Sequence, residues 1–124
     1  MTIHLDTSAL VGALSGPRDA FDRLRTLIAE GHRVRLSTIV LHEWLRGPRT
    51  VTELRVQEDL FARDRAVPFD AEAAARAAAL YVRLPRARSR GLDLAIAACA
   101  LADDAALWTL NLDDFADVPG LRLT

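Results

Sequence analysis

Residues Thr2 to Leu10 read TIHLDTSAL and join two structural signals without a linker. The first four are apolar and β-branched in part, which is typical of a short strand. Asp6, Thr7 and Ser8 follow, and their side chains are of the kind that caps the N-terminus of a helix. We therefore expect a strand over residues 2–5 that leads directly into a helix over residues 9–14.

The same alternation of strand and helix continues along the chain. Short apolar runs predict further strands over residues 34–37, 66–69 and 105–109, with a short fifth over 121–123. Apolar spacing, caps and stops predict the helices between them. The first of these runs from about Phe21 to a stop at Gly31, and the second covers residues 38–46. The third begins at the capping-box pair Thr50 and Glu53. The fourth runs from the cap Asp70 to near Pro85, and the fifth covers residues 93–102.

This order of elements favours an α/β fold with a central, mostly parallel sheet of four or five strands flanked by helices, forming a three-layer sandwich. In the helix opened by Thr50, we expect Val51, Leu54 and Phe61 to face inward. The length predicts one domain over residues 1–124, because it leaves no room for a second core.

Composition narrows the possible functions. All 16 basic residues are Arg, and the formal net charge is −1. The absence of Lys excludes a Schiff-base lysine and the lysine of a phosphate-binding loop. Cys99 lies in an apolar run and is expected to be a small buried residue. No signal peptide or membrane span is predicted, so we expect a cytoplasmic protein.

Acidic residues gather where ligands bind in open α/β sheets, at the carboxyl ends of the strands. Asp6 ends the first strand, Glu43 lies in the helix after the second, and Asp93 begins an apolar helix. Asn111, Asp113 and Asp114 follow the strand over 105–109. Carboxylates at one edge repel one another and raise each other's pKa. A hard cation such as Mg²⁺ or Mn²⁺ relieves this repulsion, because it prefers oxygen ligands.

Each acid also has a purely structural interpretation. Asp6 taken alone is more often a helix cap than a ligand. Glu43 fits a surface position, Asp93 fits the favourable N-terminal end of a helix dipole, and Asp113 and Asp114 fit a turn. Their common edge favours a site. The scattered histidines 4, 32 and 42 do not predict a zinc site.

Four stretches resemble the motifs of the PIN-domain family, and more narrowly those of the VapC ribonuclease toxins of toxin–antitoxin pairs. They read LDTSAL at 5–10, STIVLHEWLRG at 37–47, DLAIAACA at 93–100 and TLNLDDF at 109–115. The resemblance covers the whole chain, implies the PIN-domain fold, and places the motif acids at Asp6, Glu43 and Asp93. For the fourth position it favours Asp114, with Asp113 and Asn111 as alternatives.

The resemblance implies a Mg²⁺- or Mn²⁺-dependent endoribonuclease in which a metal-activated water hydrolyses an RNA phosphodiester. Asp6 and Asp93 would hold the metal directly, and Glu43 and Asp114 directly or through water. The side chains expected to hydrogen-bond these acids or to position water are Thr7, Ser8 and Asn111.

Arginines beside the acids are candidate ligands for RNA phosphates, because a guanidinium matches phosphate geometry. They are Arg46 and, just before Asp93, Arg86, Arg88 and Arg90. A solvated helix end is the alternative for the second group. The resemblance also implies a cognate antitoxin and a homodimer. Two other functions remain open, namely a PIN-fold nuclease in RNA processing and an inactive PIN-like binding module.

Overall fold

The computed structural model describes residues 1–124, and its first strand runs into its first helix as predicted. Strand β1 (Thr2–Leu5) ends at Asp6, and helix α1 (Thr7–Ser15) begins at the next residue. Asp6 has extended backbone angles, and its carboxylate accepts a hydrogen bond from the Ala9 amide. The capping signal in the sequence therefore predicts the start of this helix to within two residues.

Three parallel strands form the sheet, in the order β2-β1-β3. β2 spans Arg33–Arg35 and β3 spans Ala106–Trp108. In the central strand, Ile3 pairs with Val34 on one side and with Ala106 on the other. The fold class is confirmed, but the continuous sheet has three strands and not the four or five expected.

The two remaining predicted strands are reduced to single bridges. Val67 pairs with Ser37 beyond the end of β2, and Leu123 pairs with Leu107 on the far side of β3. Pro68 directly follows Val67 and has no amide hydrogen, so it cannot extend the ladder. Both segments thus lie at the edges of the sheet.

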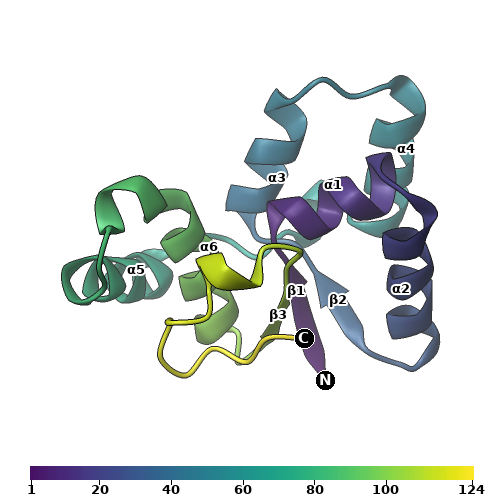
Figure 1. Ribbon diagram of the computed structural model, residues 1–124. Coiled ribbons are helices and arrows are strands. Elements are labelled where there is room, and N and C mark those ends of the chain that lie inside the picture. The colour runs from purple at the N-terminus through teal and green to yellow at the C-terminus, as the bar shows by residue number, and fades with distance from the viewer.

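Helices pack on both sides of this sheet, with α1 and α2 on one side and α5 and α6 on the other (Figure 1). Helix α3 contacts both α1 and α6. The remaining bounds are α2 (Arg18–Ala29), α3 (Thr38–Arg46), α4 (Val51–Leu60), α5 (Ala71–Arg83), α6 (Gly91–Ala102) and the 3₁₀ turns η1 (Arg63–Arg65), η2 (Ala87–Arg90) and η3 (Leu112–Asp114). This arrangement confirms the predicted three layers.

Helix α6 is the most buried helix, since every residue from Leu94 to Ala100 is buried. Small side chains in this run allow close approach of α5 on one side and β3 on the other. Cys99 is among these buried residues, and burial raises the pKa of its thiol to about 11. The expectation of a small buried residue is confirmed.

The prediction for helix α4 is correct for the start of the helix but wrong for the residues that face inward. Thr50 and Glu53 form the predicted reciprocal capping box. Val51, however, is 73% exposed, Leu54 also lies at the surface, and only Phe61 reaches the core. The inward residue of the helix is Gln57, whose amide donates a hydrogen bond to the Phe61 carbonyl at 3.0 Å. The apolar pattern did not predict this, because a polar side chain is buried only where it finds a hydrogen-bond partner, and the pattern does not show that partner.

None of the helices is both long enough and apolar enough to cross a membrane.

Candidate functional site

Asp6 anchors the site at the carboxyl end of β1. The residue is 4% exposed, and its backbone amide donates to the Trp108 carbonyl of β3. Its Oδ1 accepts hydrogen bonds from Ser8 Oγ at 2.7 Å and from the Ala9 amide at 2.8 Å. Its Oδ2 accepts a hydrogen bond from Thr109 Oγ1 at 2.5 Å. Asp6 is therefore a helix cap, and the same contacts also hold its carboxylate in one orientation.

Glu43 is tied to the same edge through Thr7. The Thr7 hydroxyl donates to Glu43 Oε1 at 2.5 Å, which links the first turn of α1 to the middle of α3. The other carboxylate oxygen of Glu43 accepts from Arg46 at 3.3 Å, one turn further along α3. Glu43 is thus held beside Asp6, although the two residues belong to different elements.

Asp93 lies in the first turn of α6, and its environment shows that the acids are close together. Burial and the negative charges of Asp114, Asp6 and Glu43 raise the pKa of Asp93 from 3.8 to about 6, and the nearby Arg90 cation opposes that shift. No hydrogen bond to the carboxylate offsets the repulsion. The side chains of four separate segments therefore share one electrostatic environment.

Among the acids proposed for the fourth position, only Asp114 is among the charges that raise the pKa of Asp93. Asp114 ends η3, whereas Asp113 has no such effect. Asn111 takes part through its backbone amide, which donates to Thr109 Oγ1 at 3.0 Å. We refer below to Asp6, Glu43, Asp93 and Asp114 as the acidic cluster.

Hydroxyl side chains hydrogen-bond two acids of the cluster, Asp6 and Glu43. Ser8 bonds to Asp6 as expected, and it also accepts the Leu110 amide at 3.0 Å. Thr7 contacts Glu43 rather than Asp6. Thr109 was not among the side chains predicted to bond the acids, although the pairing of Leu5 with Trp108 places it directly beside Asp6. Thr109 is the first residue of the fourth motif, but only the strand register indicates that it contacts Asp6.

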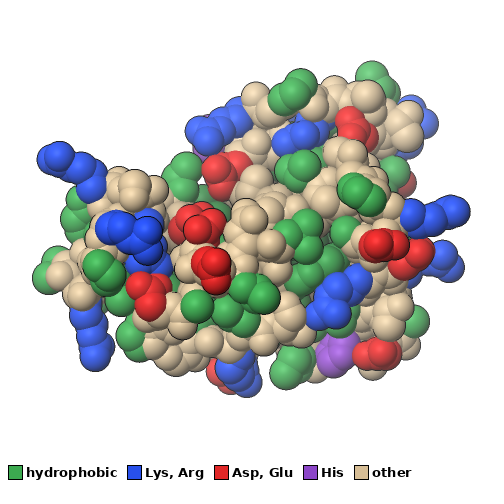
Figure 2. Space-filling view, viewed as in Figure 1, with side chains coloured by type: hydrophobic (Ala, Val, Ile, Leu, Met, Phe, Trp, Pro, Cys, Tyr) green, Lys and Arg blue, Asp and Glu red, His purple; other side chains and the backbone are tan.

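The predicted phosphate-binding arginines fall into two groups. Arg46, Arg86 and Arg88 are exposed, and Arg46 forms an ion pair with Glu43 of the acidic cluster. Arg90 is 8% exposed and forms an ion pair with Asp117. Its guanidinium is directed into the protein, so the structure does not support the expectation that it binds phosphate. On the face shown in Figure 2, acidic side chains gather between the α5–α6 side and α1, with arginines beside them.

The acidic cluster fits a hard divalent cation by its donor atoms. No three His, Cys, Asp or Glu side chains converge closely enough to enclose a metal together, so the carboxylates form an open group rather than a cage. Mg²⁺ is commonly bound through one or two carboxylates while it keeps several waters, and such binding does not require a preformed cage.

A cavity of about 480 Å³ lies elsewhere, between β2 and the segment after α4. Its lining includes Arg33, Leu41 and Phe61 but no acid of the cluster. We therefore place the candidate site at the acidic cluster and not in this cavity.

Solved toxin–antitoxin complexes contain chains similar to this one over its whole length. A chain of VapBC2 from Rickettsia felis, bound to a promoter DNA fragment, has a TM-score of 0.79 and 25% identity, with 100% of this chain and 98% of that chain covered. A chain of a toxin–antitoxin complex from Klebsiella pneumoniae has a TM-score of 0.72 and 27% identity, with 96% of this chain and 94% of that chain covered. A chain of VapBC-5 from Mycobacterium tuberculosis has a TM-score of 0.62 and 27% identity, with 99% of this chain and 95% of that chain covered.

A search of curated proteins found no match to this sequence. The family model of the PIN domain matches residues 3–121, a range that includes all four acids of the cluster. The predicted resemblance is thus confirmed by an independent comparison. The chain belongs to the PIN-domain family.

Proposed function

We propose that this protein is a divalent-metal-dependent endoribonuclease and the toxin of a toxin–antitoxin pair, with its active site at the acidic cluster. The observation that carries the proposal is that four acids from separate segments interact at one edge of the sheet, where burial and then the charges of Asp114, Asp6 and Glu43 raise the pKa of Asp93 to about 6. Mutual repulsion of this kind destabilises a folded protein unless a cation neutralises it. A structural role alone gives no reason to gather these charges.

Asp6 and Asp93 are the proposed direct metal ligands, with Glu43 and Asp114 bound directly or through water. Oδ1 of Asp6 already accepts two hydrogen bonds, whereas Oδ2 accepts one and keeps a lone pair for a cation. The Thr109 and Ser8 hydroxyls fix that orientation before a cation binds. A Mg²⁺ or Mn²⁺ ion bound there would supply an activated water and neutralise charge on the phosphate.

Arg46, Arg86 and Arg88 are the proposed contacts to the RNA backbone. All three guanidinium groups are accessible, and Arg46 already lies 3.3 Å from Glu43 at the edge of the cluster. Guanidinium groups bind phosphate oxygens in a two-pronged geometry. These cations would offset the negative charge that the cluster presents to an approaching polyanion.

The proposed toxin role rests on the similarity to solved toxin–antitoxin complexes from three organisms. The same similarity supports a cognate antitoxin protein as partner. A second copy of this chain is a further proposed partner, which rests on the family resemblance alone.

RNA cleavage with and without Mg²⁺ or Mn²⁺ tests the proposal. We expect cleavage to require the ion and to be lost in Asp6→Asn and Asp93→Asn. Asp64→Asn changes an exposed acid outside the cluster and is the matched control, which should cleave as the wild type does. Cleavage at the full rate by both cluster variants would show that the active site lies elsewhere.

A further inference from the structure

Arg90 differs from every other arginine in the chain because it is the only one of the 16 that is buried. It is the last residue of η2 and the N-cap residue of α6, three positions before Asp93. Burying a cation is unfavourable unless it is paired and hydrogen-bonded. The partners of Arg90 therefore indicate what its burial stabilises.

Its guanidinium joins three separate segments. Nη2 and Nη1 donate to the two carboxylate oxygens of Asp117 at 2.6 and 3.0 Å, which is a two-pronged ion pair. Nη2 also donates to the backbone carbonyl of Asp114 at 2.9 Å, and Nη1 donates to the carbonyl of Pro85 at 3.2 Å. The side chain of Arg90 thus binds three places at once. These are the end of η3 at Asp114, the turn after η3 at Asp117, and Pro85 in the segment that follows α5.

The contact with the Asp114 carbonyl matters most for the acidic cluster. Asp114 lies on a 3₁₀ turn of three residues, whose nearest core anchor is the buried Phe115. The Asp114 and Asp93 carboxylates repel each other, and this repulsion disfavours the position of η3 beside α6. The hydrogen bond from Arg90 opposes that effect at the backbone of Asp114 itself.

We infer that Arg90 is a positioning residue whose guanidinium holds the backbone of Asp114 beside the start of α6, so that Asp114 and Asp93 stay together before a cation binds. The inference rests on the proposed function, since it assigns the cluster to metal binding. It gives Arg90 no contact with RNA.

A role of Arg90 through its position and a role through its charge predict opposite effects on the binding of a cation. If Arg90 acted only through its positive charge, removing it would strengthen the binding of a cation nearby. If it acts by position, a change that keeps the charge but loses the contacts weakens that binding. Arg90→Lys makes this change, because an ammonium group cannot bridge Asp117 and two carbonyls in the geometry of a guanidinium.

The test is calorimetric titration of Mn²⁺ into the full chain without RNA. We expect the Kd for Mn²⁺ to rise about 10- to 100-fold in Arg90→Lys, the range typical when residues that orient metal ligands are changed. Asp117→Asn should shift the Kd in the same direction but less, because the contact with the Asp114 carbonyl remains. Arg76→Lys, on the exposed face of α5, is the matched control and should leave the Kd unchanged.

Each outcome has a distinct meaning. A Kd within twofold of the wild type in both Arg90→Lys and Asp117→Asn overturns the inference and leaves the proposed function intact. An unchanged Kd combined with a raised KM for RNA would show that Arg90 binds phosphate. No Mn²⁺ binding by the wild type overturns both proposals. Should Arg90→Lys fail to fold, the Asp117→Asn titration decides the question alone.

Discussion

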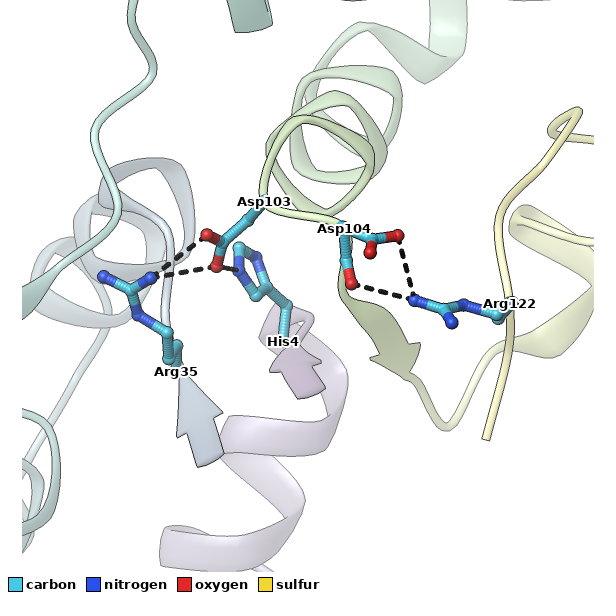
Figure 3. A network of polar contacts seen from close by, with 5 residues as sticks. All are labelled: His4, Arg35, Asp103, Asp104 and Arg122. Atoms are coloured by element: carbon cyan, nitrogen blue, oxygen red, sulfur yellow. Dashed lines mark hydrogen bonds and ion pairs between the residues drawn. The ribbon is translucent and has the colours of Figure 1, made fainter. Parts of the chain in front are cut away.

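Helix α6 has acidic residues at both ends, and the two ends are built in opposite ways. At its N-terminal end, Asp93 faces three other carboxylates, and Arg90 only partly offsets their charge. Just past its C-terminal end, Asp103 accepts hydrogen bonds from His4 at 2.8 Å and from Arg35 at 3.0 Å (Figure 3). Asp104 next to it pairs with Arg122.

The difference separates acids that stabilise the fold from acids that keep binding capacity. Asp103 joins β1, β2 and α6, and its charge is already compensated. The acidic cluster is compensated only in part, by Arg46 and Arg90, and the repulsion that remains makes it less stable without a cation than with one. Four predictions test this distinction, beginning with the largest expected effect.

Removing the charge of Asp93 and removing that of Asp103 should have different effects on cleavage and opposite effects on stability. Asp93→Asn should reduce cleavage at least about 100-fold, because it removes a proposed metal ligand. It should also raise the free energy of unfolding of the metal-free protein by an amount on the order of 1 kcal/mol after solvent screening, because it relieves repulsion. Asp103→Ala should leave cleavage unchanged but cost about 1–3 kcal/mol, since His4 and Arg35 lose their partner.

Cleavage assays and urea unfolding without metal measure both effects. Loss of cleavage in Asp103→Ala while the protein remains folded, or a less stable Asp93→Asn, would contradict the distinction between the two ends.

Thr109→Val should reduce cleavage about 10-fold, because Asp6 loses the hydroxyl that orients its Oδ2. The same change costs about 1 kcal/mol of stability, because the Asn111 amide loses its acceptor. Val67→Thr, at the opposite edge of the sheet, is a control for changing a hydroxyl and a methyl group at a bridge residue. Equal cleavage by Thr109→Val and the wild type would show that Asp6 needs no such orientation.

Acidification should affect the two ends of α6 with opposite signs. Burial holds the pKa of His4 below 6.5 despite its contact with Asp103, so the folded state binds this proton less tightly than the unfolded state. Stability therefore falls as the pH drops through about 6.5. The pKa of Asp93 is raised to about 6, so its contribution to the stability of the metal-free protein increases between pH 6 and 4.

Urea unfolding of the metal-free protein from pH 7.5 to pH 5 separates these contributions. His4→Gln should lose the decrease near pH 6.5, and Asp93→Asn should show a steeper net decrease on acidification than the wild type. Identical pH profiles for the three proteins would mean that neither residue changes its proton affinity on folding.

The smallest effect should come from Arg122→Ala. The side chain of Asp104 is fully exposed, and the ion pair at 3.4 Å is screened by solvent. We expect no measurable change in Tm, in contrast to Asp103→Ala. A large decrease would show that compensation by a surface cation also matters at this end.

Much of the fold follows from local signals that the residues themselves carry. Three helices begin at caps whose hydrogen bonds span only three residues of the chain. The caps are Asp6, the capping box of Thr50 and Glu53, and Asp70. The edge on which the acids lie also follows, because parallel strands place their carboxyl ends together. Pro68 shows the limit of this reasoning, since the apolar run around it reads as a strand but lacks the amide needed to continue one.

The sequence was therefore sufficient to establish the α/β class, the PIN-domain resemblance and the common edge of Asp6, Glu43 and Asp93, because periodicity, caps and strand order are short-range properties. It favoured Asp114 over Asp113 only through the family resemblance, and it did not reveal that Thr109 bonds to Asp6. Nor did it separate the buried Arg90 from its exposed neighbours Arg86 and Arg88. Those outcomes depend on contacts between residues more than 20 positions apart, where only the packing of η3 and β3 against α6 and β1 sets which side chain faces inward.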